Sequence, residues 1–380
     1  MNDWQQSLAG AIERVEVRLD RLKRRLGTAL GESPGIFIVP YRSYGGGGRL
    51  LVQGRVLSNT PIGKPVEDDK LWRNFFNTYR RLESDEIAGA CIRARFGEVT
   101  GDAVSDEEGF FSFWLQGVDA SPAGHWSHVN LRLCGPGAVN GDGANAIAEI
   151  LVPSEQAQFG VISDIDDTVM QSYATELIRM AKLTFLGNAH TRLPFPGVAA
   201  FYRALQYGAG PGATAPNPLF YVSSSPWNLY DLLVDFFDLR GIPAGPMFLR
   251  NWGISRNELL PTKHSGHKLE AIETLFEFYA GMPFILIGDS GQQDPEIYAE
   301  TVRRHSQRIM AVYIRDVSHD ERRDKAVQEL AKEVIRAGST LILAEDTLVM
   351  GRHAAENGWI RQDAIEQITR EIEEDLSRTK

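Results

Sequence analysis

Two short acidic motifs carry the clearest chemical signal in the sequence. The first, DIDDT at 164–168, places three acids within four residues directly after an apolar run. Carboxylates packed this closely repel one another, and one of them would have a strongly raised pKa unless a cation were present. The second motif, GDSGQQD at 288–294, also follows an apolar run. If the two runs form neighbouring strands, Asp164, Asp289 and Asp294 converge, and Mg²⁺ with its preference for oxygen ligands would satisfy them.

Helix capping is the ordinary alternative for each motif taken singly. Aspartate is a preferred N-cap residue, and Asp294 stands directly before Pro295, which suits a helix start. Capping does not account for both motifs at the ends of two separate apolar runs. The pair therefore favours a metal site.

Two further segments fit chemistry on a phosphate group. The run PLFYV ends in Ser223, Ser224, Ser225 and Pro226. Hydroxyls and free N–H groups at a helix N-terminus bind phosphate, although a serine cap followed by proline explains this segment equally well. Lys268 stands at the start of an expected helix, where a cation opposes the helix dipole. Its position there therefore needs a reason other than helix stability. Neutralising a phosphoryl group is one such reason.

Lys263 competes with Lys268 for this role, because it lies five residues upstream in the preceding loop.

The acidic motifs lie in a segment where strands and helices are expected to alternate. From residue 159 onward the apolar runs are FGVISD, PLFYVS, PMFLR, PFILIGD and RIMAVYI, and helical stretches are expected near 197–207, 227–239, 268–280, 294–305 and 319–337. This alternation predicts a parallel sheet with helices on both faces. Active sites in such folds lie beyond the carboxyl ends of the strands, which is where both motifs stand.

The segment from 34 to 152 is predicted to be a β-sandwich-like domain. It contains six runs rich in β-branched or aromatic residues: GIFIVPY, RLLVQGRVL, CIRARFGEV, FFSFWLQG, HVNLRLCG and AIAEILVP. A lone helix is expected at 71–82. His125 and His128 are interpreted as ordinary histidines, since no third metal ligand accompanies them.

The two ends of the chain are predicted to be helical. Residues 1–30 carry a heptad-like apolar stripe with several arginines on the other face. A helix docked on protein or a short coiled coil is favoured, and a helix lying on a membrane surface is the alternative. The segment 356–380 is expected to be a charged helix without chemistry of its own.

The composition limits the classes of protein to consider. The chain has 380 residues, of which 43% are hydrophobic and 24% charged, and a net charge of −10. These values exclude a disordered chain, and the acidic balance argues against a nucleic-acid partner. Cys91 and Cys134 are too few for a disulfide framework or a zinc cluster. With no apolar run of about 18 residues and no signal-like N-terminus, a cytoplasmic location is expected.

Taken together, the motifs resemble those of the haloacid dehalogenase superfamily. DIDDT fits the DxDxT signature of its phosphatases, and GDSGQQD fits their GDxxxxD acidic motif. Ser223 and Lys268 fit the intervening Ser/Thr and Lys. The longer strings FYVSSSPWNL, HKLEAI and GDSGQQDPEIY resemble the actin-patch-type phosphatidate phosphatase catalytic domain, a relative of the lipins. With VPYRSYG included, the likeness covers roughly residues 34–355.

The resemblance implies a fold and a set of domains. The segment 159–355 would be a Rossmann-like α/β phosphatase domain with a minimal cap, since the insertion between residues 170 and 196 is too short for a full one. The β-sandwich-like domain and the N-terminal helix would precede it, and the charged helix 356–380 would follow.

The resemblance also implies roles for the motif residues. Asp164 would be the nucleophile that forms an aspartyl-phosphate, and Asp166 the general acid and base. Mg²⁺ would be held by Asp164, Asp289 and the carbonyl of Asp166, with Asp294 completing or orienting the set.

The phosphoryl oxygens would be bound by Ser223 and Lys268. Thr168, Ser224 and Ser225 are further candidates for substrate binding. Asp167 has no assigned role.

The expected substrate is phosphatidate or a similar lipid phosphomonoester. An uncapped site admits a group presented from a surface, so the enzyme would be cytoplasmic and peripheral at membranes. The alternatives are a phosphatase for protein or soluble phosphomonoesters and a non-catalytic lipid-binding adaptor. Both acids of the DxDxT motif are present, which argues against the adaptor.

Overall fold

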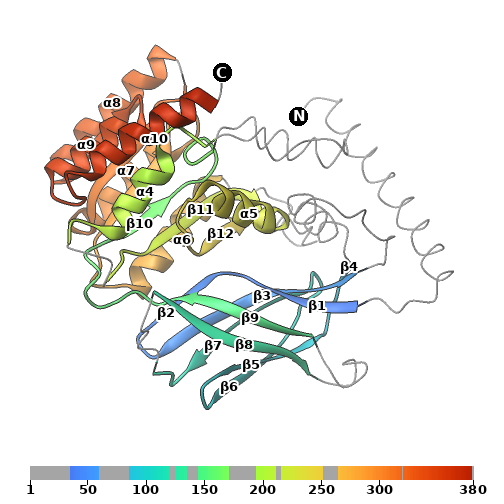
Figure 1. Cartoon of the computed structure of the whole chain (residues 1–380). Helices are drawn as coiled ribbons and strands as arrows, with labels where there is room; N and C mark the ends of the chain where they lie inside the picture. The colour runs from blue at the N-terminus through green and yellow to red at the C-terminus, as the bar shows by residue number, and fades with distance from the viewer. Residues whose placement is uncertain are drawn as a thin grey trace.

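The computed structural model describes eight stretches of the chain: 35–59, 85–119, 125–134, 144–170, 194–210, 215–250, 264–318 and 320–378. The helices expected at 1–30 and 71–82, Lys263 and most of the insertion between 170 and 196 lie outside these residues. The described residues form a β-rich part followed along the chain by an α/β part (Figure 1). No helix in the described stretches is long and apolar enough to cross a membrane.

Nine strands form the β-rich part: β1 (Gly35–Pro40), β2 (Ser43–Gly46), β3 (Arg49–Asn59), β4 (Asp85–Glu86), β5 (Cys91–Phe96), β6 (Val99–Val104), β7 (Phe110–Gln116), β8 (Trp126–Cys134) and β9 (Asn145–Leu151). Strand β3 pairs with β1, β4 and β7, while β9, β8, β5 and β6 pair in that order; β2 pairs with both β3 and β9. Buried apolar residues of both groups of strands pack in one cluster. This arrangement resembles a sandwich.

One predicted strand is wrong. The run CIRARFGEV is a hairpin, because β5 ends at Phe96 and β6 begins at Val99. Gly97, at the turn, has a φ of 58°, a left-handed conformation that glycine adopts without steric cost.

The candidate metal ligands of the β-rich part do not form a metal site among the described residues. Cys91 and Cys134 face each other on β5 and β8 and are joined by a disulfide, a pairing that the sequence left open. His128 is exposed on β8, and neither it nor His125 belongs to a metal-ligating group. Disulfides are rare in a reducing cytoplasm, so this bond does not support the cytoplasmic location expected from the sequence. That location stays a prediction.

The α/β part contains the predicted parallel sheet. Its strands are β10 (Gly160–Ser163), β11 (Leu219–Pro226), β12 (Met247–Arg250), β13 (Phe284–Asp289), β14 (Ile309–Arg315) and β15 (Leu341–Ala344). All pair in parallel, in the order β12-β11-β10-β13-β14-β15. The order reverses between β10 and β13, and ligands of doubly wound sheets bind at such a switch point.

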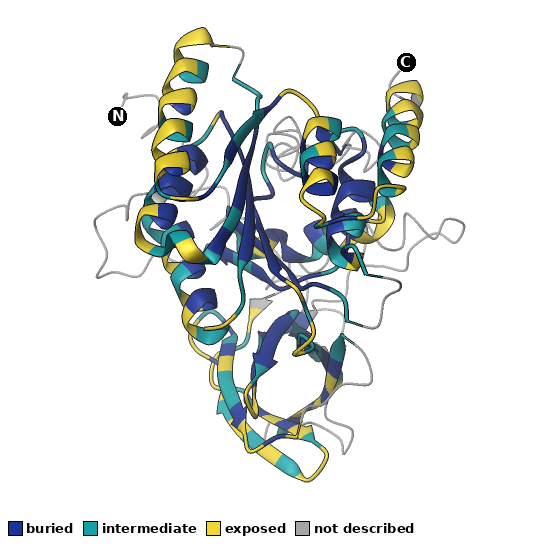
Figure 2. Cartoon of the chain, turned by 90° about the vertical axis from the view of Figure 1, so that its left-hand side faces the viewer, coloured by how far each residue is buried: buried dark blue, intermediate teal, exposed yellow. Residues whose placement is uncertain are grey.

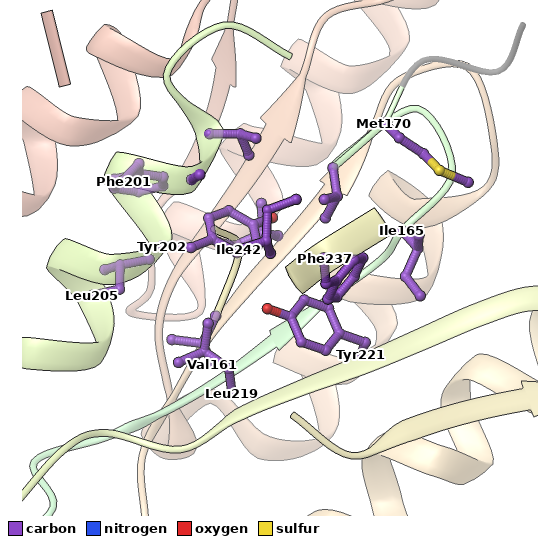
Figure 3. Packing of buried hydrophobic residues seen from close by; sticks show 14 of the residues in the cluster. Val161, Ile165, Met170, Phe201, Tyr202, Leu205, Leu219, Tyr221, Phe237 and Ile242 are labelled. Atoms are coloured by element: carbon purple, nitrogen blue, oxygen red, sulfur yellow. The ribbon is translucent and has the colours of Figure 1, made fainter. Parts of the chain in front are cut away.

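Helices cover both faces of this sheet (Figures 1 and 2). They are α4 (Val198–Tyr207), α5 (Tyr230–Arg240), α6 (His264–Phe278), α7 (Asp294–His305), α8 (Glu321–Arg336), α9 (Thr347–Glu356) and α10 (Ala364–Arg378), with the short turns η2 (Trp227–Leu229) and η3 (Ser306–Arg308). Figure 3 shows Tyr202 of α4 near Val161 and Tyr221 of the sheet, within the same buried cluster. The continuous apolar runs are therefore strands buried on both faces.

The charged C-terminal helix α10 contributes to this core. Ile368 is fully buried, and two acids of α10 accept hydrogen bonds from the free N–H groups where α4 starts. Glu371 accepts from the Ala200 N–H at 2.7 Å, and Asp375 accepts from the Gly197 N–H at 3.0 Å. Negative charge at a helix N-terminus is stabilising, so these acids hold α10 on α4.

The β-rich part packs directly on the α/β part. Tyr44 is buried in an apolar cluster that also contains Phe220 and Ile272. Tyr41 stacks on Trp227, with ring centroids 4.5 Å apart. The two parts thus share apolar clusters, and one of their contacts lies just after the serine segment.

Candidate active site

The two acidic motifs meet where the order of the sheet reverses. Strands β10 and β13 are neighbours, and the Asp164 N–H donates to the Ile287 carbonyl at 2.9 Å. Carboxylate oxygens of Asp164, Asp289 and Asp294 lie within 4.8 Å of one another, and all three residues are fully buried. The structure thus brings together the three acids that the sequence predicted to converge.

Lys268 of α6 lies between two of these acids. Its Nζ is 2.8 Å from Asp164 Oδ1 and 2.5 Å from Asp294 Oδ1, and only 3% of its side chain is exposed. Burial by itself would lower the pKa of Lys268, but the charges of Asp164 and Asp294 outweigh it and raise the pKa. The ammonium therefore stays protonated, and Asp294 is an ion-pair partner of Lys268 as well as a candidate metal ligand.

The cluster holds more acid than Lys268 can neutralise. Burial raises the pKa of Asp164 well above its usual range, and three neighbouring acids add to this while Lys268 opposes it. Burial raises the pKa of Asp289 to about 7, and the charge of Asp294 is the next largest cause of this increase. Protons or a further cation are needed to relieve this repulsion.

Several buried carboxylate oxygens lack hydrogen-bond partners within the described part of the chain. They are Asp164 Oδ1, Asp166 Oδ1 and Asp289 Oδ2. Asp164 Oδ1 faces Lys268 Nζ without hydrogen-bond geometry. Among the described residues, no cation pairs with Asp166 Oδ1 or Asp289 Oδ2. Unsatisfied buried oxygens are costly, and a hard divalent cation would satisfy them. The residues present therefore fit an oxygen-ligated metal such as Mg²⁺.

Two of the three predicted serines hold Asp166. Ser223 Oγ donates to Asp166 Oδ2 at 2.7 Å, and Ser225 Oγ donates to the same oxygen at 3.0 Å. Ser224 lies between them on β11 and is less buried than either. Side chains alternate along a strand, so Ser224 is directed away from Asp166. The structure does not bring Ser224 to the site.

Asp167 shapes the loop that carries these acids. It has a φ of 58°, and its N–H donates to the Met170 carbonyl at 2.8 Å. Aspartate tolerates this left-handed conformation better than most residues. Thr168, the last residue of the motif, places Oγ1 3.4 Å from Asp164 Oδ2. Asp167 therefore has a conformational role that the sequence analysis did not assign.

Gln292 and Arg323 were missed by the sequence analysis. The Gln292 N–H donates to Asp289 Oδ1 at 2.8 Å, and its amide donates to the Asp166 carbonyl at 3.3 Å, the oxygen that the resemblance implies as a metal ligand. Arg323 of α8 donates to the carbonyls of Ser290 and Gln292. Gln292 lies inside the GDSGQQD motif, but nothing in the sequence near Arg323 marks it.

Comparison with known proteins finds a family model that matches part of this chain. Residues 159–316 match the family model described as "Phosphatidate phosphatase APP1, catalytic domain". This segment is therefore similar to the APP1 catalytic domain. The match contains Asp164, Asp166, Lys268, Asp289 and Asp294, so the whole acidic cluster lies within the APP1-type segment.

Two curated relatives match part of this chain over a smaller part of their own length. Phosphatidate phosphatase APP1 of Saccharomyces cerevisiae is 31% identical over 206 residues, which are 51% of this chain and 33% of that protein. An uncharacterised protein of Schizosaccharomyces pombe is 32% identical over 163 residues, 42% of this chain and 25% of that protein. The chain therefore spans about a third or less of the length of these relatives.

Among solved structures, a carbohydrate acetylesterase of Xanthomonas citri is 10% identical and has a TM-score of 0.26. The alignment covers 80% of this chain and 75% of that one. No argument about fold or function is drawn from so low a score.

Proposed function

We propose that this chain is a Mg²⁺-dependent phosphatase of the haloacid dehalogenase type that hydrolyses phosphatidate, or a similar lipid phosphomonoester, through an aspartyl-phosphate. The observation that carries the proposal is the buried carboxylate of Asp164 at the switch point of the sheet. Lys268 lies 2.8 Å from it, and Asp289 and Asp294 lie in the same cluster. The match of residues 159–316 to the APP1 catalytic-domain model supports phosphatidate as the substrate class.

Asp164 acts as the nucleophile in this proposal. Its carboxylate attacks phosphorus, the P–O bond to the glycerol oxygen breaks, and an acyl phosphate forms on Asp164. Lys268 Nζ, between Asp164 and Asp294, favours the anionic form of the attacking group and so opposes the effect of burial on its pKa. The same ammonium stabilises the charge on the phosphoryl oxygens.

Asp166 acts as the general acid and then the general base. Its Oδ2 accepts from both Ser223 and Ser225, while its Oδ1 has no hydrogen-bond partner among the described residues. Oδ1 is thus available to carry the proton that the leaving alkoxide takes. It then accepts a proton from the water that hydrolyses the acyl phosphate.

The metal would be held by Asp164, Asp289 and Asp294, whose oxygens lie within 4.8 Å of one another. The unpartnered Oδ2 of Asp289 is the clearest vacant ligand atom. When bound, Mg²⁺ would offset the repulsion between the anionic substrate and these carboxylates.

Asp289→Asn should stabilise the metal-free protein in a pH-dependent way. The pKa of Asp289 is raised in the folded protein, to about 7. The folded protein therefore loses stability as the pH rises from the pKa of Asp289 in the unfolded chain to its pKa in the folded protein. Asparagine mimics the neutral form, so the gain in unfolding free energy should grow between about pH 4 and pH 7 and then level off. Urea denaturation at several pH values measures this.

Asp320→Asn is the control, since Asp320 is an exposed N-cap of α8 and asparagine caps equally well. In the same proteins, Mg²⁺ should raise the melting temperature of the wild type and raise that of Asp289→Asn much less. An equal Mg²⁺ shift in both would remove Asp289 from the metal site.

Ser223→Ala should slow turnover by about 10- to 100-fold, because Asp166 loses one of the two hydroxyls that orient it. Ser224→Ala is the matched control on the next residue of the strand and should turn over within about twofold of the wild type. Steady-state phosphate release from both variants checks this. Equal losses in the two would mean that the serine segment acts only through the structure of β11.

The substrate assignment is tested by phosphate release from phosphatidate in mixed micelles and from a panel of soluble and protein phosphomonoesters, each with and without Mg²⁺. We expect Mg²⁺-dependent release that follows the surface fraction of phosphatidate. A preference for soluble or phosphoprotein substrates would replace the lipid assignment, and lipid binding without any release would favour an adaptor. Vesicle co-sedimentation with and without residues 1–30 tests the proposed peripheral location.

A further inference from the structure

A buried arginine lies beside the acidic cluster without contacting it. Arg315 is the last residue of β14, in register with Asp289 on β13, and only 4% of it is exposed. Its Nε donates to the Thr168 carbonyl at 3.3 Å, and its Nη2 donates to Thr347 Oγ1 at 3.0 Å. The guanidinium lies 4.2 Å from the centre of the Phe195 ring.

The charge of Arg315 is not neutralised by a direct partner. Its guanidinium forms no ion pair among the described residues, and its hydrogen-bond acceptors are a carbonyl and a hydroxyl. Burial lowers the pKa of Arg315 to about 10, although Tyr202 and the charge of Asp346 oppose this, and Arg315 is still charged at neutral pH. A buried charge without an adjacent counter-ion is costly. A protein with an apolar side chain of similar volume in its place is often no less stable. The core packing alone does not account for an arginine here.

Arg315 connects the Asp164–Thr168 loop, the chain leading into α4 and the start of α9. Thr168 ends the loop that begins at Asp164 and points its hydroxyl towards that carboxylate. Phe195 donates its N–H to the Val169 carbonyl at 3.2 Å, which joins the chain leading into α4 to the same loop. Thr347, at the start of α9, donates its hydroxyl to the Pro196 carbonyl at 2.8 Å.

We propose that Arg315 is a positioning residue that fixes the Asp164–Thr168 loop for phosphoryl transfer, an inference that rests on the function proposed above. The planar guanidinium donates in two directions while it stacks on an aromatic ring, which a lysine ammonium cannot do. Its two hydrogen bonds hold the Thr168 carbonyl at a fixed place relative to α9. Small displacements of a nucleophile cost large factors in rate, so this restraint serves turnover.

Arg315→Met tests the proposal, because methionine fills similar volume without charge or donors. We expect kcat on phosphatidate micelles to fall at least about tenfold, KM to change less than about threefold, and the melting temperature to stay within a few degrees of the wild type. A purely structural arginine would give the opposite pattern, with a lower melting temperature and an unchanged kcat for the folded protein.

Arg308→Met is the matched control. Arg308 donates to the carbonyls of Met282 and Tyr279 and lies over the rings of Phe276 and Phe284, just before β14 begins. It thus has the same kind of contacts away from the acidic cluster. This variant should keep the kcat of the wild type whatever its melting temperature.

Hydrogen exchange of the peptide that carries residues 164–170 gives a readout that does not depend on turnover. Its amides should exchange faster in Arg315→Met than in the wild type and be unchanged in Arg308→Met. If the wild type releases no phosphate, the proposed function fails while the exchange still tests the restraint. If Arg315→Met does not fold, Arg315→Lys decides: a kcat reduced at least about threefold at an unchanged melting temperature supports the proposal. Wild-type kcat and exchange in either folded variant would overturn it.

Discussion

Asp164→Asn is expected to abolish phosphate release while leaving the protein folded. The amide is nearly isosteric with the carboxylate but is a very weak nucleophile, so turnover should fall by at least roughly 10³-fold. Lys268 keeps its ion pair with Asp294, and the cluster loses one of its mutually repelling acids. The unfolding free energy should therefore fall by no more than about 1 kcal/mol, and a gain would also fit.

The measurement pairs single-turnover phosphate release with urea denaturation of the same preparation. Asp316→Asn is a suitable control, since Asp316 accepts from Ser290 Oγ at 3.1 Å and lies outside the cluster of Asp164, Asp289 and Asp294. A folded Asp164→Asn protein that retained a tenth of the wild-type rate would contradict the nucleophile assignment.

Lys268→Met is expected to be the most destabilising of these changes. It leaves the buried carboxylates of Asp164 and Asp294 without the ammonium that lies 2.8 and 2.5 Å from them. Removing one partner of a buried ion pair costs about 3–5 kcal/mol. Turnover should also be lost, because the phosphoryl oxygens then lack the ammonium that stabilises their charge.

The loss of stability should depend on pH. Without Lys268, the folded-state pKa of Asp164, already raised by burial, should rise further, so the folded variant takes up protons as the pH falls. The deficit relative to the wild type should therefore be smaller at pH 5 than at pH 7.5. Lys332→Met, which breaks an exposed ion pair with Glu329, should change little at either pH. An equal deficit at both pH values would mean that the buried acids are not the source of the cost.

The α/β part was predictable because its strands are buried on both faces. Such strands are continuous apolar runs, as PFILIGD and RIMAVYI are, and their carboxyl ends lie at one edge of the sheet. The acids at those ends could therefore be assigned to one site before any contact was known.

Other features depend on geometry that a linear pattern does not contain. Ser223 and Ser225, but not Ser224, contact Asp166, because side chains alternate along β11. Arg315 reaches the catalytic loop from 147 residues away in the sequence, and no local motif marks it. Strand β2 was missed because its sequence, SYGG, contains few strand-forming residues.

The most direct test of the account is to trap the covalent intermediate. Protein turning over phosphatidate with Mg²⁺ would be quenched, reduced with borohydride and digested for mass spectrometry, since borohydride converts an aspartyl-phosphate into homoserine. The account predicts homoserine at position 164, and none when Mg²⁺ or phosphatidate is omitted or when Asp164→Asn is used. Phosphate release from phosphatidate without modification of Asp164, or with homoserine at another aspartate, would contradict it.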